Sequence, residues 1–557
     1  MNELQQHVTT IIQTLYQQSV EPTITRPEPQ FGDYTTNVAL QLAGRVGQNP
    51  RHIAEAIAAE LTATGQYQSV EVAGPGFINI TVSPQALLAG LTAPVATPYA
   101  GQKLVFEYSC PNAFKELHTG HLYQTIYGDI VARLMEQGGA DLQRTSFGGD
   151  VGLHVAKCMW GMQALSGGYT PSALAEVPDD AFERARWISR CYVRGASAYE
   201  EDPAAREVID ELNTTIYNLH EQDEHSTPLA QMYWQTRQWS FDYFDAFYKL
   251  IDVTPMRYYP ESQTSPVGMA EVKRQLAKGN LVESEGAVVF KGDPDRHLHT
   301  RVFVTRRGLP TYETKDIGVI WLEMQDYNFD QRYLLTGNDQ KEYMRVVYAA
   351  AETFRPQLKG AMTHLTNGTV RFADGKKMSS RLGNVSRAAD VISAVQCKVA
   401  ELVQGEEQRR IVTLGAIKYA FARYKLGGDI NFDIDETVSL HGNSGPYVQY
   451  AHARAQRILE KHGQAPEAIH QVYSEDRALV RKLGEYPQVL SRAITNLEPH
   501  YICTYLFELA QEFNRYYEHN QVIGSPKQAH RAGLVAAYAG TLKAGLATLG
   551  IQAPNRL

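Results

Sequence analysis

Hydrophobic and polar residues are distributed along the N-terminal part of the chain in a way that predicts a mixed domain of helices and strands. A helical pattern opens the chain and is followed by a proline-rich turn, RPEPQFGDY, at residues 26–34. Two further helical patterns cover 37–46 and 50–61, and a strand pattern covers 76–82. The segment ATPYAGQ then has the composition of a linker. We therefore expect an α+β domain over residues 1–97.

A strand, a helix and a second strand follow this linker. The run KLVFEYS at 103–109 is rich in apolar residues, as in a parallel strand that is covered on both faces. The next helix carries one apolar stripe, and Gly138 with Gly139 should end it. The stripe comprises Leu122, Ile126, Ile130, Val131, Leu134 and Met135. Because DLQRTSF at 141–147 again has a strand pattern, the succession predicts a Rossmann-like, doubly wound parallel sheet.

Charged, helix-favouring sequence interrupts this alternation from about residue 155 to 300. We expect a helical insertion there, between two halves of the sheet, after which the apolar strands RVFVTRR and RYLLTG resume the sheet. From about residue 395 the pattern is almost entirely helical. The expected fold class is α/β and multi-domain, with the α+β domain first, the sheet over 98–394 and an all-α helical bundle over 395–557.

Length and composition agree with several domains in a soluble protein. A chain of 557 residues exceeds the roughly 250–300 residues at which a single core stops growing. Its hydrophobic share of 43% is ordinary, and no stretch approaches the roughly 18 consecutive apolar residues of a membrane span. The opening, MNELQQHVTTIIQTL, lacks the pattern of a signal peptide. We therefore expect a cytoplasmic protein that does not bind membranes.

Cysteine spacing and charge narrow the chemistry a little further. The five cysteines are scattered without a CxxC pair, which argues against a disulfide framework and against a zinc site. The formal net charge is −8, but residues 396–557 carry 18 Lys and Arg against 16 Asp and Glu, a net of +2. The C-terminal part is therefore the better candidate for contact with a nucleic acid, although this asymmetry is small.

Two histidines flank a glycine between the first strand of the sheet and its helix. In HTGH, His118, Gly120 and His121 stand at the expected N-terminus of that helix, where unpaired N–H groups favour anions. Gly120 lets a phosphate approach the backbone, and the ring N–H groups can donate to its oxygens. Taken alone, the tetrapeptide favours histidines that cap the helix or lie in the core. Its place between strand and helix favours phosphate binding.

A basic loop far downstream completes a known pair of signatures. The segment ADGKKMSSRLGN at 373–384 carries Lys376, Lys377 and Arg381 between two turn-forming pairs. HTGH and KMSSR together resemble the HIGH and KMSKS signatures of class I aminoacyl-tRNA synthetases, and no Walker loop or GxGxxG segment competes with them. The resemblance implies that both elements close on the triphosphate of ATP, which brings Mg²⁺ with it. It implies ATP binding by His118, Gly120, His121, Lys377, Met378 and Ser379.

The reaction of that family needs no protein nucleophile. The carboxylate of the amino acid attacks the α-phosphorus of ATP and pyrophosphate leaves, so that the protein contributes positioning and charge neutralisation. The resemblance implies that His118 and His121 stabilise the charge that develops on the phosphates. It implies that Lys377 holds the departing pyrophosphate. No dedicated carboxylate site for a metal ion is evident in the sequence.

The surroundings of HTGH resemble one branch of the family, the arginyl-tRNA synthetases. The similarity lies in EYSCPNAFKELHTGH, at residues 107–121, and rests on the spacing of Glu107, Ser109, Pro111, Asn112 and Lys115. The basic loop departs from KMSKS because Ser380 stands where the second lysine is usual. Members of this branch place a lysine just upstream of the histidines instead. Lys115 occupies that position, and the resemblance implies that it is catalytic.

Recognition of free arginine requires carboxylates, because a guanidinium presents a planar fork of donors. PTYETKDIG at residues 310–318 resembles the arginine-binding segment of the branch, and its Tyr312 and Asp316 are four residues apart, on one helical face. The resemblance places Glu107, Tyr312 and Asp316 at the guanidinium. It places Asn112 and Gln340 at the α-amino end. Without the resemblance, Asp316 would be taken for an acid on a helix surface.

The resemblance extends over nearly the whole chain. FGDYTTNVALQLA with VAGPGFINI is similar to the N-terminal domain of the branch, which contacts the elbow of tRNA, and GNSGPYVQYAHARAQRILEK is similar to its C-terminal anticodon-binding domain. The aromatic and polar side chains of that segment imply tRNA contacts, although tyrosines at helical spacing more often belong to a core. The implied contacts are Tyr447, Gln449, Tyr450, His452 and Arg454. The insertion and the terminal Leu557, where methionine is usual, match least well.

Two other functions remain open at this point. A synthetase-derived tRNA-binding protein without catalysis would keep the flanking domains and lose the ATP signatures, which are all present here. A small-molecule nucleotidyltransferase could share the HxGH turn, but it would have no use for a long helical tail with aromatic and basic residues. The sequence therefore favours an enzyme that joins arginine to tRNA(Arg) with ATP, as a monomer. The branch generally requires bound tRNA before it activates arginine.

Overall fold

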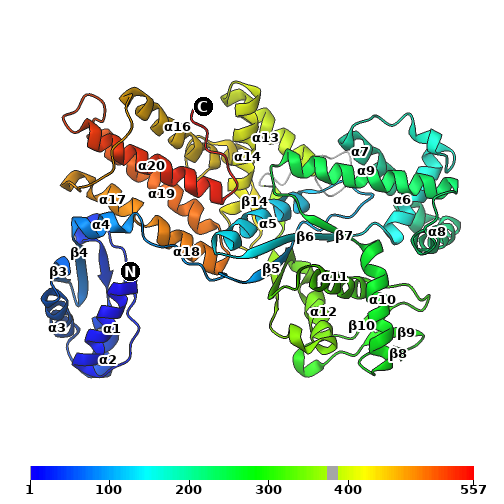
Figure 1. Cartoon of the computed structure of the whole chain (residues 1–557), viewed down its shortest axis with the longest axis horizontal. Coiled ribbons are helices and arrows are strands. Elements are labelled where there is room, and N and C mark those ends of the chain that lie inside the picture. Colours follow the sequence, from blue (N-terminus) through cyan, green and yellow to red (C-terminus); the bar gives the residue numbers. More distant parts are fainter. Residues whose placement is uncertain (1, 373–386) are drawn as a thin grey trace.

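The structure, a computed structural model, describes residues 2–372 and 387–557. The predicted basic loop, with Lys377, Met378 and Ser379, lies outside these residues. Figure 1 shows an elongated molecule in which the parallel sheet is central. The C-terminal helices lie on one side of it, a helical insertion on the other, and the N-terminal domain lies beneath the C-terminal helices. None of the described helices is long and apolar enough to cross a membrane.

The N-terminal domain packs three helices around one antiparallel sheet, whose strands lie in the order β1-β2-β4-β3. The three predicted helices and the strand at 76–82 are confirmed, whereas the pattern missed β3 and the two short strands. Val8, Leu42 and Ile57 are fully buried between helices and sheet. The elements are α1 (Asn2–Tyr16), β1 (Ile24–Thr25), β2 (Tyr34–Thr36), α2 (Val38–Val46), α3 (Pro50–Ala63), β3 (Tyr67–Ala73), β4 (Phe77–Val82) and the connecting α4 (Pro84–Gly90).

The central sheet has five parallel strands in the order β12-β11-β5-β6-β7, which confirms the predicted doubly wound core. Helix α5 lies on one face and α11 with α12 on the other (Figure 1). KLVFEYS and DLQRTSF form the neighbouring strands β5 and β6, and RYLLTG forms β11. The elements are β5 (Lys103–Glu107), α5 (Thr119–Gln137), β6 (Asp141–Gly148), β7 (Arg257–Pro260), α11 (Tyr312–Tyr327), β11 (Gln331–Gly337), α12 (Lys341–Phe354) and β12 (Met362–Asn367).

Two expectations about the middle of the chain are wrong. The sheet resumes at β7, which pairs with β6, so the interruption does not continue to residue 300. RVFVTRR is not a strand of the main sheet, because its β10 pairs antiparallel with β9 in a small separate sheet. A short apolar run does not specify its pairing partner. The elements here are α6 (Leu153–Ser166), α7 (Ala181–Glu201), α8 (Pro203–Glu221), α9 (Pro228–Leu250), α10 (Glu261–Ala277), β8 (Val282–Ser284), β9 (Ala287–Phe290) and β10 (Arg301–Val304).

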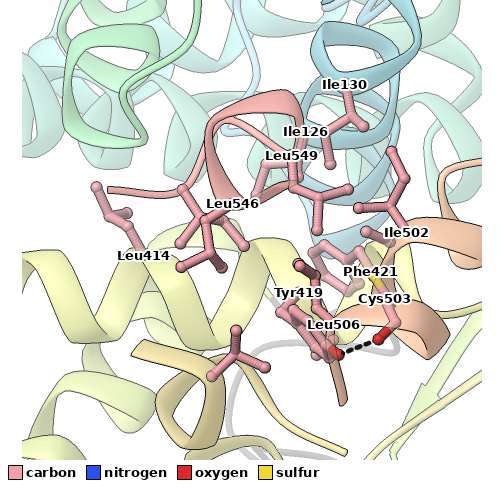
Figure 2. Packing of buried hydrophobic residues seen from close by; sticks show 14 of the residues in the cluster. Ile126, Ile130, Leu414, Tyr419, Phe421, Ile502, Cys503, Leu506, Leu546 and Leu549 are labelled. Atoms are coloured by element: carbon pink, nitrogen blue, oxygen red, sulfur yellow. Dashed lines mark hydrogen bonds between the residues drawn. The ribbon is translucent and has the colours of Figure 1, made fainter. Parts of the chain in front are cut away.

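The C-terminal region is helical, as predicted, apart from one short parallel pair of strands, β13 with β14. Its helices share a hydrophobic core with α5. Figure 2 shows Ile126 and Ile130 of α5 beside Leu549, while the Tyr419 hydroxyl donates to the Cys503 carbonyl at 2.7 Å. The elements are β13 (Val370–Phe372), α13 (Ala388–Leu402), α14 (Glu406–Ala422), β14 (Ile430–Phe432), α15 (Ile434–Val438), α16 (Gly445–His462), α17 (Arg477–Leu483), α18 (Tyr486–Asn496), α19 (His500–His519) and α20 (Gln528–Thr548).

Candidate active site

The loop between β5 and α5 has an uncommon backbone conformation. Ser109, Cys110 and Phe114 have φ angles of 73°, 47° and 64°. Such angles are unfavourable for residues with a β-carbon, and they persist where the surroundings hold them in place, often at functional sites. Here the Ser109 hydroxyl is hydrogen-bonded to the Thr125 hydroxyl at 2.7 Å and to the Tyr248 hydroxyl at 3.0 Å. The loop between β5 and α5 is therefore held by hydrogen bonds to two helices, α5 and α9.

His118 and His121 cap the N-terminus of α5 reciprocally. Nδ1 of His118 accepts from the backbone N–H of His121 at 3.3 Å, and Nδ1 of His121 accepts from the backbone N–H of His118 at 3.3 Å. The two rings are stacked with their centroids 3.8 Å apart. Because each Nδ1 accepts, the proton of each neutral ring must be on Nε2. Both rings can therefore donate through Nε2–H to an anion at the helix N-terminus.

Gly120 is required by this arrangement. A β-carbon at this position would lie 2.8 Å from Cε1 and 2.9 Å from Nδ1 of His118, so a side chain would displace the ring from the cap. Burial is the main cause that holds the pKa of His121 well below its ordinary value, and the charges of His118 and Lys115 act in the same direction. The ring of His121 is therefore neutral at pH 7. The capping and phosphate-binding interpretations concern different atoms and are compatible.

Lys115 projects from the same loop, on the side of the helical insertion. Its Nζ lies 4.3 Å from the centroid of the Tyr192 ring, which belongs to α7. An ammonium over an aromatic face is held by the ring quadrupole, and the interaction is stronger where water is excluded. Lys115 is also close enough to lower the pKa of both His118 and His121. The lysine and the two histidines thus lie around one end of α5.

A buried ionic cluster lies at the end of β5. Glu107 is 2% exposed and is paired with Arg332 of the neighbouring strand β11. Arg332 also donates through Nε to Glu323 at 2.6 Å, and Glu323 accepts from the Thr145 hydroxyl at 2.6 Å. The Cys110 thiol lies 3.5 Å from Oε1 of Glu107. Sequence patterning missed Arg332, because one charged residue at the start of an apolar run gives no sign of burial.

Helix α11 brings further carboxylates to Glu107. Asp316 is buried and accepts a hydrogen bond from the Tyr343 hydroxyl of α12. Burial raises the pKa of Asp316 to about 7, against the opposing effects of Tyr343 and Arg332. The charge of Asp316 in turn raises the pKa of Glu107. Glu107, Glu323 and Asp316 together outnumber the single cation of Arg332, so the cluster is suited to a second, external cation.

The remaining predicted ligands differ in their exposure and in their contacts. Tyr312, at the first turn of α11, is 62% exposed. Asn112 is fixed by its Oδ1, which accepts from the backbone N–H of Gly149 at 2.8 Å. Gln340 is exposed in the turn after β11, and its amide donates to Asp339 at 2.6 Å. The structure therefore buries Glu107 and Asp316 near enough for their charges to interact, and leaves Gln340 exposed.

No group of three or more His, Cys, Asp or Glu side chains within residues 2–372 and 387–557 is arranged to hold a metal ion. The acids at the end of β5 are engaged by arginine, tyrosine and threonine instead.

Three of the predicted tRNA-contacting residues lie on one face of α16. Tyr450 is 44% exposed, and Arg454 is exposed with its guanidinium 5.0 Å from the Tyr517 ring. Both Arg454 and the Tyr447 hydroxyl are hydrogen-bonded to Asn514, each at 3.2 Å. Tyr447, Tyr450 and Arg454 share one outward face of the helix.

Gln449 and His452, also predicted to contact tRNA, do not share this outward face. Both side chains are fully buried. Gln449 donates to the carbonyls of Ile411 and Gln552 at 3.2 and 2.9 Å, and His452 is hydrogen-bonded to the carbonyl of Pro554 at 2.9 Å. They face inward because they lie on the opposite side of α16 from Tyr450. Their role is to attach the C-terminal segment to the helices.

Three family models together cover most of the chain. The model described as tRNA synthetases class I (R), catalytic domain, matches residues 84–423. The arginyl tRNA synthetase N terminal domain matches residues 2–82, and the DALR anticodon binding domain matches residues 448–557. The chain belongs to the arginyl-tRNA synthetase family. The predicted family and the predicted multi-domain α/β fold are therefore confirmed.

Relatives and solved structures agree with this family along their whole length. The arginine–tRNA ligase of Thermobifida fusca is 31% identical over 564 residues, which cover 96% of this chain and 95% of the relative. That of a Synechococcus species is 29% identical over 566 residues, covering 95% and 94%. The arginyl-tRNA synthetase structure of Thermus thermophilus covers 100% of both chains with a TM-score of 0.77 at 23% identity. That of Plasmodium falciparum has a TM-score of 0.78 at 18% identity, covering 100% of this chain and 99% of the other.

The activity of this arginyl-tRNA synthetase family member is that of an arginine–tRNA ligase. The alternative of a tRNA-binding protein without catalysis is not favoured, because the model of the catalytic domain matches throughout the sheet and the ATP-signature histidines stand at the helix N-terminus.

Proposed function

We propose that arginine and ATP react at the carboxyl ends of β5 and β11, between the acid cluster and the N-terminus of α5. The observation that carries this proposal is the pair of buried carboxylates, Glu107 and Asp316, at the end of β5, the strand whose following loop leads to the two Nε2–H donors at the N-terminus of α5. An anion binds favourably at such a terminus, and a guanidinium pairs best with carboxylates. One end of the site thus suits the triphosphate, and the other suits arginine.

In the proposed reaction, a carboxylate oxygen of arginine forms a bond to the α-phosphorus of ATP while the bond from that phosphorus to the bridging oxygen breaks. The products are arginyl-adenylate and pyrophosphate. His118 and His121 donate to phosphate oxygens, and Gly120 leaves room for them. Lys115 and Lys377 neutralise and hold the leaving pyrophosphate, while Met378 and Ser379 bind ATP from the same KMSSR segment as Lys377. Transfer of the arginyl group to the 3′-terminal adenosine of tRNA(Arg) then releases AMP.

The proposed arginine site uses charge at one end and amide groups at the other. Glu107 and Asp316 pair with the guanidinium, and the Tyr312 ring covers it. Asn112 and Gln340 orient the α-amino end. Because Oδ1 of Asn112 already accepts from the chain, its contribution to the substrate would come through the amide N–H groups or the chain it positions.

The proposed tRNA contacts lie in the first and the last domain of the chain. The N-terminal domain would contact the elbow, and the outward face of α16, with Tyr447, Tyr450 and Arg454, would hold unstacked anticodon bases. A monomeric enzyme in the cytoplasm, with Mg²⁺ supplied by ATP and no zinc, remains the prediction from the sequence.

Attachment of each of the twenty amino acids to total tRNA tests the function directly. We expect arginine alone to be attached, in a reaction that depends on ATP and Mg²⁺. Retention of tRNA by the protein without attachment of any amino acid would support the non-catalytic alternative instead.

Lys115 is expected to replace the lysine that the loop lacks at Ser380. Lys115→Ala should lower kcat/KM for ATP, and the addition of Ser380→Lys should recover part of that loss, because both positions would serve the same pyrophosphate oxygens. The four proteins of this double-mutant cycle are compared by pyrophosphate exchange with and without tRNA. If Ser380→Lys changes the rate by the same factor in both backgrounds, Lys115 does not substitute for the loop lysine.

Replacement of Arg454 is expected to weaken tRNA binding, whereas replacement of Gln449 is expected to lower stability. Arg454→Ala should raise KM for tRNA by about tenfold, since it removes an exposed cation next to aromatic rings, and should leave the melting temperature unchanged. Gln449→Ala should lower the melting temperature, because two buried backbone carbonyls lose their donor at a cost of about 1–3 kcal/mol. Thermal melts and arginylation kinetics with varied tRNA measure both. A larger KM effect for Gln449→Ala than for Arg454→Ala would contradict the assignment.

A further inference from the structure

Arg332 lies at the centre of the acid cluster, and all three of its nitrogen positions are engaged. Nε donates to Glu323 at 2.6 Å, Nη1 donates to the Tyr348 hydroxyl at 3.2 Å, and Nη2 donates to Glu107. The residue is 1% exposed. Arg332 is thus held in one orientation, with no surface from which to reach a substrate. Its position on β11, next to β5, places the guanidinium beside the last residue of that strand.

The contact with Arg332 determines what Glu107 can do. Burial raises the pKa of Glu107, and the charge of Arg332 is the largest influence that opposes this rise. The neighbouring acids Glu323 and Asp316 act in the same direction as burial. The Cys110 thiol near Oε1 is a weak donor and cannot replace a guanidinium. Burial raises the pKa of Glu107 to about 8 even beside Arg332, and without that cation the buried carboxyl among like charges would bind its proton still more strongly.

We propose that Arg332 is a positioning residue for arginine recognition, which holds the carboxyl group of Glu107 in one orientation without itself touching the substrate. The inference rests on the proposed role of Glu107 as a ligand of the substrate guanidinium. One oxygen of Glu107 is held by Arg332, so the other, Oε1, is the acceptor left for the substrate. A protonated Glu107 would present a hydroxyl to the guanidinium and would lose the ionic part of the interaction.

The simultaneous contact of residue 332 with Glu107 and Glu323 requires an arginine rather than a lysine. Arg332 binds Glu107 and Glu323 from different nitrogens of one planar group, whereas a lysine ammonium would be a single point charge on a flexible chain. Thr145 of β6 fixes the far side of Glu323, at 2.6 Å, so that this carboxylate cannot move toward Glu107. Charged groups therefore approach Glu107 from both sides, Arg332 from β11, and Glu323 and Asp316 from α11.

The test is the charge-balanced double variant Arg332→Met with Glu323→Gln, which removes one cation and one anion and leaves Glu107 without its partner. With tRNA present in a pyrophosphate exchange assay, KM for arginine should rise about 10- to 100-fold, while KM for ATP changes less than about threefold. Because the charge of Arg332 lowers the pKa of Glu107 more than the charge of Glu323 raises it, loss of both should raise this pKa further. The increase of kcat/KM for arginine with pH should therefore occur at a higher pH than in the wild type.

Two single variants are the controls for the double variant. Glu323→Gln keeps the contact between Arg332 and Glu107, and should have nearly the KM for arginine of the wild type. Glu107→Gln tests the proposed function itself. An unchanged KM for arginine in Glu107→Gln means that Glu107 is not a ligand and that the proposed function fails at this residue. A raised KM in Glu107→Gln, with a wild-type KM and pH profile in the double variant, overturns the role of Arg332 alone.

Equal KM effects in Glu323→Gln and in the double variant would also overturn the inference, because the effect would then come from the loss of Glu323. Should the double variant fail to fold, Arg332→Lys decides, since it keeps the buried charge. A rise of about tenfold or more in KM for arginine, with KM for ATP unchanged, supports the positioning role. A KM for arginine equal to that of the wild type refutes it.

Discussion

Replacement of His121 by alanine is expected to lower kcat for arginine activation about 10²- to 10³-fold, the effect of removing one donor that stabilises charge in the transition state. The structure adds a second, smaller effect. Nδ1 of His121 caps α5, and loss of a cap costs about 1 kcal/mol of stability. The variant should therefore melt slightly below the wild type, and its loss of activity should exceed by far what that small loss of stability explains. Pyrophosphate exchange in the presence of tRNA and a thermal melt provide the two measurements.

His121→Asn is the matched control for this result. The amide oxygen of asparagine can accept from the backbone N–H of His118 as Nδ1 does, but the side chain has no group at the position of Nε2. We expect wild-type stability with the low activity of His121→Ala. A variant with both stability and activity intact would show that His121 serves only as a cap.

The parts of the fold that local sequence determines were predictable. Helix α5 follows from its apolar stripe and ends where Gly138 and Gly139 predict, because both signals lie within the element. The assignments of β7 and β10 failed for the opposite reason. The strand RYYP is four residues long and ends in proline, so it has almost no pattern, and RVFV would suit either sheet. Which strand pairs with which depends on contacts far away in the chain.

In the candidate site, too, local features could be predicted from the sequence, whereas features that depend on distant contacts could not. The histidine pair could be placed from its position between a strand and a helix, because that position fixes its surroundings. Arg332 could not be placed, since its burial results from Glu107 and Glu323 on two other elements. The burial of Gln449 could not be predicted either, because the spacing of polar residues does not state which side of a helix meets the bundle. Only the packing of α16 against α14 and α20 decides that.

Replacement of Asp316 by asparagine is expected to raise KM for arginine about 10²- to 10³-fold. A buried guanidinium that loses its carboxylate remains as an unpaired charge, at a cost of about 2–5 kcal/mol, and each 1.4 kcal/mol corresponds to a factor of ten. KM for ATP should change little, because Asp316 lies at the acid cluster and not at the end of α5. Kinetics with arginine and ATP varied in turn provide the comparison. Equal increases in both constants would show that Asp316 is not an arginine ligand.

Glu313→Gln is the control for charge on the same helix. Glu313 is buried one turn before Asp316 and lies 3.8 Å from Arg301, and its charge raises the pKa of Asp316. Its replacement removes a carboxylate of the same helix that the proposed site does not use. KM for arginine should stay close to the wild-type value, which separates the pairing of Asp316 with the substrate from a general loss of negative charge.

The pH dependence of arginine use gives a second measure of the same residue. Burial raises the pKa of Asp316 to about 7, so that in the absence of substrate this carboxyl is protonated below that pH and offers no ionic partner to a guanidinium. In the wild type, kcat/KM for arginine should therefore fall as the pH drops below about 7. Glu107, whose pKa burial also raises, titrates with it, and the fall can involve two protons. In Asp316→Asn the remaining fall should correspond to one proton at most. An unaltered slope in this variant would mean that the titration belongs to other groups, and that Asp316 is not the carboxylate that arginine requires.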